Sequence, residues 1–318
     1  MTDRPAVLIM QRHLGPITAF LQGSYDVYRF WEHPPAEAAP LVRAMVVAGE
    51  FELEKQVIET LPNLGLIACF TSGYDRIDVA WAEARGLSLS HAPGVNHEEV
   101  ADFALGQMLA VRREIVAGDR ALRAGLWSVG QKTLNRAMRG QKVGIVGLGA
   151  IGEALAQRCQ ALNMEVRWWG PREKPQSPWT RANSLIDLAS WADNLVIACR
   201  VDETNVSMVS REIIHAVGPG GLIVNVARGQ VIDEPGLIEA LKSGALGFAA
   251  LDVFTEEPTR PELWADVPNT VLTPHNAGAT TDSVQRMLLL LMQNLAAYFV
   301  GEPLVTPIPG RGGATAGD

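Results

Sequence analysis

The sequence predicts an α/β protein built from two doubly wound parallel-sheet domains, one inserted within the other. Three observations lead to this fold class. Short apolar runs alternate with helical patterns from residue 6 onward, a glycine-rich turn stands in mid-chain, and a complete set of strands precedes that turn. Such alternation is typical of parallel sheets with helical crossovers. The 318 residues are enough for about two domains of ordinary size.

Composition and charge limit the classes of function. The formal net charge of −8 leaves no basic excess to neutralise phosphates, so a nucleic-acid partner is not expected. The three cysteines, Cys69, Cys159 and Cys199, have no C-x-x-C spacing. This predicts buried thiols in a cytoplasmic protein, with neither disulfides nor a metal site. The N-terminus lacks a signal-peptide pattern, and the apolar helix at 287–300 is too short to cross a bilayer, so no membrane association is expected.

The first domain is expected to be a flavodoxin-like substrate domain. Its candidate strands are residues 6–10, 27–30, 44–47, 66–70 and 87–90, and helical spacing occurs at 52–61 and 78–85. A last helix at about 281–300 is expected to return to this domain. The first domain would therefore comprise residues 1–95 and 284–318, with the cofactor domain at 96–283.

A helix and an arm connect the two sets of strands. The expected helix runs from about residue 96 to 117 and is apolar nearly all round, which indicates burial between domains or subunits. Residues 120–140 are polar and punctuated by glycines, with Trp127 alone among them. They are expected to form a connecting arm.

The second domain is predicted to be a Rossmann domain. Its candidate strands are residues 142–146, 165–169, 195–199, 222–226, 248–253 and 270–272. The first runs into the spacing G-x-G-x-x-G, whose members are Gly147, Leu148, Gly149, Ala150, Ile151 and Gly152, and helix-forming residues follow at once. In such a turn the first glycine permits the bend, the second lets backbone N–H groups approach a pyrophosphate, and the third allows helix to pack on strand. The motif therefore predicts a dinucleotide site.

The end of the second strand of this domain indicates which dinucleotide binds. An NAD-binding fold has a carboxylate there that bonds the ribose 2′-hydroxyl, whereas this chain has Gly170, Pro171 and Arg172. Without the carboxylate a 2′-phosphate is not repelled, and an arginine offers it two parallel donors. We therefore expect NADP(H), with NAD as the weaker alternative. Arg172 as an ordinary surface arginine is the competing interpretation, and Arg200 is a second candidate for the phosphate.

Three later segments place polar residues where predicted strands end, the edge at which open α/β sheets bind ligands. They span residues 224–233, 250–258 and 272–280 and carry Arg228, Glu257 and His275. Reduction of a 2-oxo acid needs a cation for the carboxylate, an acid for the carbonyl oxygen, and a group that keeps this acid charged. These three segments supply such a set.

These motifs resemble the D-isomer-specific 2-hydroxyacid dehydrogenases over nearly the whole chain. The resemblance rests on G-L-G-A-I-G, N-V-A-R-G-Q-V-I-D, L-D-V-F-T-E-E-P and P-H-N-A-G-A-T. Within that family the chain is most similar to NADPH-dependent glyoxylate/hydroxypyruvate reductases and their hydroxyphenylpyruvate and 2-ketogluconate relatives. The implied activity is reduction of small 2-oxo acids to D-2-hydroxy acids.

The resemblance also implies residue roles. Arg228 would bind the substrate carboxylate and carbonyl, His275 would donate the proton, and Glu257 would bond its ring. Glu257 matches better than Glu256 because the family's glutamate immediately precedes the proline. The pattern S-G-Y-D implies that backbone N–H groups of Ser72 and Gly73 grip the substrate carboxylate. The further implied cofactor contacts are Val226, Ala227, Arg228, Asp252, His275 and Ala277.

Several questions stay open in the sequence. The family forms homodimers on the interdomain helix, which here fits residues 100–116, and Trp127 either reaches a neighbouring active site or simply packs. A short-chain dehydrogenase would need Tyr-x-x-x-Lys, which none of the four tyrosines provides. The physiological 2-oxo acid is not determined, and 2-ketogluconate and hydroxyphenylpyruvate remain alternatives. A non-catalytic nucleotide-sensing corepressor or scaffold is the rival class, because fold alone does not define function.

Overall fold

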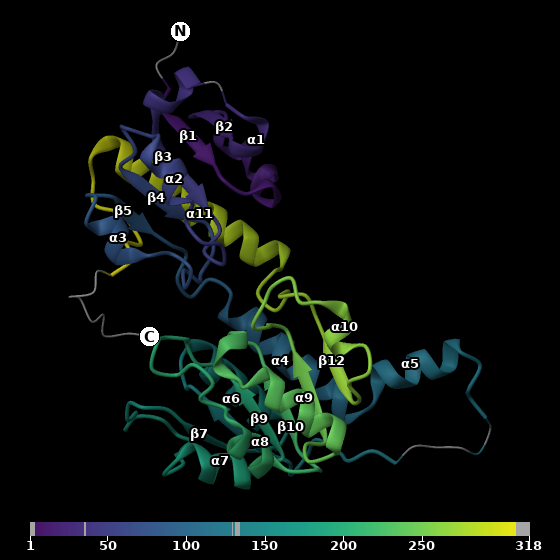
Figure 1. Cartoon of the computed structure of the whole chain (residues 1–318). Coiled ribbons are helices and arrows are strands. Elements are labelled where there is room, and N and C mark those ends of the chain that lie inside the picture. Colours follow the sequence, from purple (N-terminus) through teal and green to yellow (C-terminus); the bar gives the residue numbers. More distant parts are fainter. Residues whose placement is uncertain (1–3, 35, 129, 131–133, 310–318) are drawn as a thin grey trace. The chain divides into compact units, whose positions relative to one another are not determined.

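A computed structural model describes residues 4–34, 36–128, 130 and 134–309. The chain divides into two compact units (Figure 1). Unit 1 comprises Met1–Asn96 and Thr280–Asp318, and unit 2 comprises His97–Ala279. The second unit is thus inserted in the sequence of the first. The sequence-based boundaries stood at 95/96 and 283/284. Within the described residues, no helix is long and apolar enough to cross a membrane.

Unit 1 contains a five-stranded parallel sheet with the strand order β2-β1-β3-β4-β5. Its strands are β1 (Ala6–Ile9), β2 (Asp26–Arg29), β3 (Val42–Val47), β4 (Leu66–Cys69) and β5 (Ser88–Ser90). Short 3₁₀ helices lie at η1 (Arg12–Ile17), η2 (Phe30–Glu32) and η3 (Ala36–Leu41). The order 2-1-3-4-5 is the flavodoxin-like order expected from the sequence.

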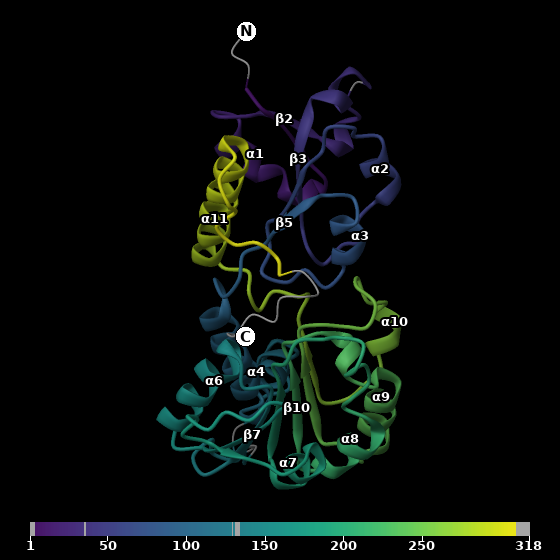
Figure 2. The same ribbon diagram turned by 90° about the vertical axis from the view of Figure 1, so that its left-hand side faces the viewer.

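Alternation along the strands of unit 1 supplies two apolar faces. Val7 and Ile9 pack with α1 (Thr18–Leu21) and α11 (Thr281–Val300) in one core cluster. Leu8 faces the opposite way and packs in a second cluster with α2 (Lys55–Glu59) and α3 (Val79–Glu83). Figure 2 shows α11 on one side of this sheet and α2 and α3 on the other. The last long helix therefore returns to the first unit, as predicted.

Unit 2 contains a seven-stranded parallel sheet with the order β12-β11-β10-β9-β6-β7-β8. Its strands are β6 (Lys142–Val146), β7 (Glu165–Trp169), β8 (Thr180–Arg181), β9 (Asn194–Ile197), β10 (Leu222–Asn225), β11 (Phe248–Leu251) and β12 (Thr270–Leu272). This is the Rossmann order, with the topological switch at β6 between β7 and β9. The two-residue strand β8 was missing from the sequence prediction because it is too short to show a pattern.

Helices cover both faces of this second sheet (Figure 2). One face packs against α4 (His97–Arg112) and α6 (Ala150–Ala161). The other face packs against α7 (Leu185–Trp191), α8 (Arg211–Val217), α9 (Glu234–Ser243) and α10 (Pro261–Trp264). A short 3₁₀ turn, η4 (Gly229–Val231), follows β10.

The helix predicted to continue to residue 117 ends earlier. Arg112 is 7% exposed and donates to Oδ1 of Asn194 at 2.8 Å and to the carbonyl of Gly220 at 2.9 Å. These bonds fix the end of α4, and Glu114 then adopts a left-handed conformation with φ of 52°. A second helix, α5 (Ile115–Arg123), takes the first residues of the predicted arm. It has no buried residue and projects from the rest of unit 2 (Figure 1).

Candidate active site

The glycine turn has the geometry that its spacing predicts. Gly147 has φ of 92°, and a Cβ there would lie 2.6 Å from Cα of Cys199. A Cβ on Gly152 would lie 2.2 Å from the carbonyl oxygen of Gly147, so helix and strand are in close contact. Gly149 caps α6, and among the described residues no atom beyond its own chain neighbours lies within 4 Å of the position its Cβ would take. The first N–H groups of α6 have no partner within the helix, and they are available to an anion beside the open space at Gly149.

The segment after β7 is rich in cations. Gly170 is buried, whereas Pro171 and Arg172 are exposed. Arg181, on β8, donates to the carbonyl of Gly170 at 2.7 and 3.3 Å. Lys174 pairs with Glu153 in the first turn of α6 at 2.9 Å. The sequence prediction had not included Arg181, because only the pairing of β7 with β8 brings it beside Gly170.

Arg228 follows β10 in a turn that Asn225 organises. Oδ1 of Asn225 accepts from the backbone N–H of Ala227 at 3.0 Å, and its Nδ2 donates to the carbonyl of Arg228 at 3.0 Å. Val226 and Ala227 are both 6% exposed. This turn sets the course of the backbone at Arg228, whose guanidinium also donates to the carbonyl of Ala227 at 2.7 Å. Asn225 is a supporting residue that the sequence prediction did not single out.

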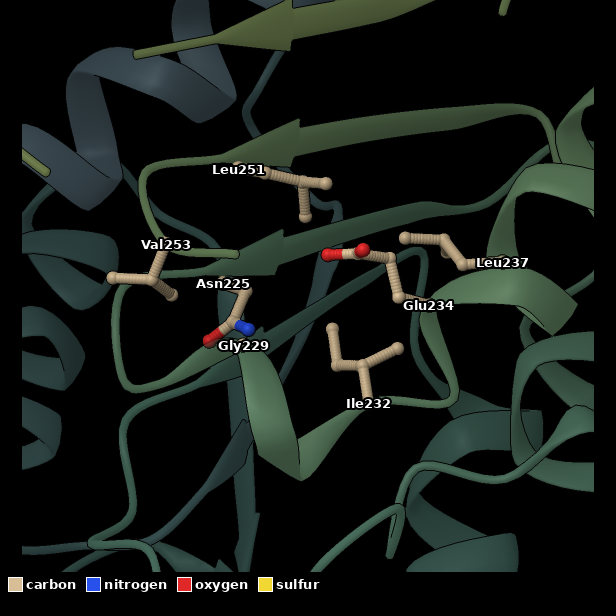
Figure 3. Close-up of a pocket in the computed structure, with 7 residues that line it drawn as sticks. All are labelled: Asn225, Gly229, Ile232, Glu234, Leu237, Leu251 and Val253. Atoms are coloured by element: carbon tan, nitrogen blue, oxygen red, sulfur yellow. The ribbon is translucent and has the colours of Figure 1, made fainter. Parts of the chain in front are cut away.

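Figure 3 shows a small hollow beside the Arg228 turn. Apolar side chains of Ile232, Leu237, Leu251 and Val253 contribute most of its wall, together with Asn225, Gly229 and Glu234. The carboxylate of Glu234 already accepts from the backbone N–H of Thr255 at 3.0 Å. The residues around this hollow therefore connect the loop after β10 with the loop after β11.

Glu257 and His275 come together from the loops after β11 and β12. Oε2 of Glu257 lies 2.7 Å from Nδ1 of His275, and Oε1 accepts from the backbone N–H of Phe254 at 2.9 Å. The hydrogen bond to Glu257 raises the pKa of His275 above its usual 6.5, although burial works in the opposite direction. Burial is the largest single influence on Glu257 and acts to raise its pKa, but the hydrogen bond and charge of His275, with the N–H of Phe254 and the charge of Arg228, together outweigh it and lower the pKa below its usual 4.5.

The positive charge of Arg228 acts on both members of this pair. It works to lower the pKa of Glu257 and also that of His275, although the net shift of the His275 pKa is upward. A carboxylate can only accept hydrogen bonds, so Nδ1 of His275 carries the hydrogen that faces Glu257. A proton on Nε2 is then present only in the imidazolium form. The structure thus brings together the three residues that the sequence analysis assigned to catalysis.

Asp252 holds the turn that carries His275. It is fully buried, and its two carboxylate oxygens accept from the backbone N–H groups of Asn276 at 3.0 Å and Ala277 at 2.8 Å. Its carbonyl accepts from the N–H of His275 at 2.8 Å. Because His275 has φ of 51°, a conformation that L residues seldom adopt, these bonds are needed to maintain the turn. The sequence analysis had given Asp252 a cofactor contact only.

In unit 1, Ser72 and Gly73 lie in the loop after β4. The hydroxyl of Ser72 donates to the carbonyl of Ala92, and Nδ1 of His91 lies 3.0 Å from the carbonyl of Ser72. The carbonyl of Gly73 accepts from the hydroxyl of Thr71 at 3.0 Å. Among the described residues, the backbone N–H groups of Ser72 and Gly73 have no acceptor. Two donors are thus available in a loop that its other bonds hold in place.

The sheet order, the glycine turn and the open space at Gly149 fit a dinucleotide, and the His275–Glu257 pair at the carboxyl edge of the same sheet has the geometry of a general acid or base. Unit 2 therefore has the features of the cofactor domain of a nicotinamide-dependent dehydrogenase.

Comparisons with known proteins agree. The profile for the NAD binding domain of D-isomer specific 2-hydroxyacid dehydrogenases matches residues 105–277. A hydroxyphenylpyruvate reductase of Plectranthus scutellarioides is 36% identical over 92% of this chain and 96% of its own length. A 2-ketogluconate reductase of Gluconobacter oxydans is 33% identical over 97% of this chain and 100% of its own length.

Among solved structures, an NADPH-dependent glyoxylate/hydroxypyruvate reductase of Sinorhizobium meliloti, in complex with NADP and malonate, superposes with a TM-score of 0.88. It is 31% identical, and the match covers 96% of this chain and 97% of the other. The chain belongs to the D-isomer specific 2-hydroxyacid dehydrogenase family. It is an NAD(P)-dependent oxidoreductase that acts on small 2-oxo or 2-hydroxy acids.

Proposed function

We propose that the protein is an NADPH-dependent reductase of small 2-oxo acids of the glyoxylate/hydroxypyruvate type. The observation that carries this proposal is the 2.7 Å pair of His275 and Glu257, on which the charge of Arg228 also acts. The names of the relatives support the substrate class. Hydroxyphenylpyruvate and 2-ketogluconate are the alternative substrates, because relatives with those names have comparable identity.

In this proposal Arg228, His275 and Glu257 have separate roles. Arg228 binds the substrate carboxylate through charge-assisted hydrogen bonds and polarises the neighbouring carbonyl. Glu257 favours the charged form of His275 by raising its pKa, and in that form His275 donates the Nε2 proton to the carbonyl oxygen. Glu257 orients the ring and stabilises the imidazolium. A bound nicotinamide supplies the hydride in reduction and accepts it in oxidation.

The backbone N–H groups of Ser72 and Gly73 are proposed to bind the substrate carboxylate as well. Two adjacent amide donors in a fixed loop form a small site for an anion. The proposal is supported by the bonds that fix Ser72 on both sides, to Ala92 and to His91.

The preference for NADPH is proposed from the segment after β7. Gly170 leaves no carboxylate to repel a 2′-phosphate, and Arg172 and Arg181 supply positive charge next to it. The fixed carbonyl of Gly170 holds this segment in place. Arg200, the second sequence candidate, is exposed after β9.

The decisive experiment compares His275→Ala and Arg228→Ala with the wild type. Both variants should lose turnover by about three or more orders of magnitude, as expected when a proton donor or substrate-orienting charge is removed. Both should still bind NADPH, measured by quenching of tryptophan fluorescence. Near-normal turnover in either variant would refute the assignment.

A panel of glyoxylate, hydroxypyruvate, hydroxyphenylpyruvate and 2-ketogluconate, compared by kcat/KM, identifies the substrate. A corepressor would bind NADPH but turn over none of them.

We also propose a homodimer that forms through α5. Ile115 and Leu122 are both 57% exposed and stand seven residues apart, on one face of this helix. Trp127, just beyond it, is 72% exposed. Apolar side chains of α4, by contrast, pack within unit 2, so α5 replaces the earlier helix as the proposed interface. The three unpaired cysteines are compatible with the proposed cytoplasmic location.

A further inference from the structure

We propose that Gln107, in the middle of α4, is a positioning residue for the turn that carries His275. It acts through Thr273 and Asp252 and has no direct contact with the reacting groups. The inference rests on the role of His275 given in the proposed function. It assigns to a residue of the apolar helix a part in catalysis that the motifs do not indicate.

A continuous series of hydrogen bonds connects Gln107 with this turn. Nε2 of Gln107 lies 3.1 Å from Oγ1 of Thr273, which in turn lies 2.6 Å from Oδ1 of Asp252. The carboxylate of Asp252 accepts from the N–H groups of Asn276 and Ala277 at 3.0 and 2.8 Å. Those two residues directly follow the catalytic histidine. A change in the orientation of the Asp252 carboxylate would therefore move the backbone on which the histidine ring depends.

The direction of each hydrogen in this series follows from the chemistry of the groups. An ionised carboxylate only accepts, so the single hydrogen of the Thr273 hydroxyl is directed to Asp252. The oxygen of Thr273 then needs a donor on its other side, and among the described residues the NH₂ end of Gln107 provides it. Gln107 thereby keeps the Thr273 hydroxyl hydrogen on Asp252 and away from the carbonyl of Leu251, which lies 3.4 Å from the same oxygen.

A glutamine at this position has a cost that an apolar residue would not have. Gln107 is 4% exposed and packs on the face of α4 that buries Ala104, Met108 and Val111. Its Oε1 atom is buried and accepts no hydrogen bond from any residue that the structure describes. Burying an unpaired carbonyl is unfavourable, so a methionine or leucine would suit the packing better. A buried group that opposes stability while supporting a catalytic turn indicates a functional role.

The first test is Gln107→Met, which keeps the length of the side chain and removes both polar atoms. The melting temperature should stay equal to that of the wild type or rise, because the unpaired Oε1 is gone. At the same time kcat should fall by about tenfold to a hundredfold, the loss expected when reacting groups are slightly misplaced. The dissociation constant for NADPH should change less than twofold.

Gln141→Met is the matched control. Gln141 is also buried, at 1% exposed, but its Nε2 donates to Ala137 at 2.7 Å and its Oε1 accepts from Asn194 at 3.0 Å. This control should lower the melting temperature and leave kcat unchanged. An unchanged kcat in Gln107→Met overturns the inference. So does a loss of kcat that is accompanied by a proportional fall in melting temperature.

Gln107→Glu adds a test that a purely structural role would not pass. A protonated carboxyl can donate to Thr273 as the amide does, whereas an ionised one can only accept and would draw the hydroxyl hydrogen away from Asp252. Turnover relative to the wild type should therefore recover at low pH and decline as the introduced carboxyl ionises. A ratio that does not vary with pH overturns the inference, and this measurement remains valid if the methionine variant does not fold.

Other titratable and charged groups lie on α4 and on the elements around it. The elements that pack against α4 or continue from it carry the following titratable and charged residues: Asp119, Arg120 and Arg123 on α5, Glu153 and Arg158 on α6, Arg228 after β10, Asp252 after β11, and His275 after β12; α4 itself carries His97, Glu98, Glu99, Asp102 and Arg112. Within the described part of the chain, only Asp252 among them shares a hydrogen-bond partner, Thr273, with Gln107. Because His275 and Glu257 titrate in both proteins, turnover is compared as the ratio of Gln107→Glu to the wild type at each pH.

A separate variant distinguishes failure of this inference from failure of the proposed function. If His275→Asn retains turnover, the assignment of the proton donor is wrong and the positioning role loses its basis. If His275→Asn is inactive but Gln107→Met and Gln107→Glu behave as the wild type, only the role of Gln107 is refuted.

Discussion

Glu257 and His275 form a hydrogen-bonded pair of 2.7 Å in which each member shifts the titration of the other. The pKa of His275 is raised and that of Glu257 is lowered. Both shifts favour the charged pair, and both depend on the contact between the loops after β11 and β12, whose two residues stand 18 positions apart in sequence. The pair is therefore the part of the site whose pH behaviour can be predicted most directly.

Replacing Glu257 by glutamine should move the alkaline limb of the pH profile for reduction toward lower pH. His275 donates only while it is charged, and the hydrogen bond that raises its pKa is weakened in this variant. Glu256→Gln is the control, because Glu256 is adjacent in sequence yet its side chain is 73% exposed and faces Arg260 at 4.0 Å. The measurement is the profile of kcat against pH. If the alkaline limb moves by the same amount in Glu257→Gln and Glu256→Gln, the assignment of Glu257 as the partner of His275 is wrong.

The same pair should make stability depend on pH in a defined window. A histidine with a raised pKa stabilises the fold fully below its usual 6.5, and this contribution is lost as pH rises through the folded value. A glutamate with a lowered pKa stabilises the folded state fully above its usual pKa of 4.5. This stabilisation is lost as the pH falls through the pKa that the glutamate has in the folded state. The unfolding free energy of the wild type minus that of Glu257→Gln should thus be greatest between pH 4.5 and 6.5. A difference that is constant from pH 4 to about 9 would argue against a charged pair.

The glycine turn allows packing and ligand binding to be separated. In Gly152→Ala the new Cβ would lie 2.2 Å from the carbonyl of Gly147, so the variant should lose about 1–3 kcal/mol of stability through overpacking. In Gly149→Ala the Cβ enters open space, so stability should be kept while the NADPH dissociation constant rises, because that space is expected to hold the pyrophosphate. Thermal unfolding and fluorescence titration on both variants check this. Normal NADPH affinity in Gly149→Ala would show that the cofactor does not approach there.

The proposed dimer can be tested on α5. Ile115→Glu combined with Leu122→Glu places two charges on the exposed apolar face and should convert a dimer into a monomer. Phe20→Glu is a suitable control, since Phe20 is 59% exposed on α1 in unit 1. Light scattering gives the mass of each protein. If the wild-type protein has the mass of one chain, the proposed dimer is wrong.

Much of this fold could be predicted from sequence because its cores repeat a simple pattern. Buried parallel strands appear as continuous apolar runs, such as β9 and β10, and glycine spacing indicates the turn before α6. The break after Arg112 could not be predicted, since it depends on bonds to Asn194 and Gly220, which are distant in sequence.

The same limit applied to the site. Arg228, Glu257 and His275 stand in recognisable motifs, whereas Gln107 and Arg181 acquire their partners only through tertiary packing. A buried glutamine in an apolar helix has no local pattern that indicates a partner 166 residues away.

The cofactor preference should be reversible at the end of β7. A Cβ on Gly170 would lie 3.5 Å from the ring of Trp168, an ordinary contact, and Gly170 does not have a positive φ, so Gly170→Asp should fold normally. The added carboxylate would repel a 2′-phosphate and accept a bond from a ribose 2′-hydroxyl. Combined with Arg172→Ala, it should lower kcat/KM for NADPH by about two orders of magnitude and raise it for NADH, in line with the value of charged hydrogen bonds. Glu165→Gln is the control, because it changes an exposed charge at the opposite end of β7 without adding a carboxylate where the strand ends. If the double variant keeps the ratio of kcat/KM for the two cofactors found in the wild type, discrimination must reside in other residues, and the proposed NADPH preference loses its structural basis.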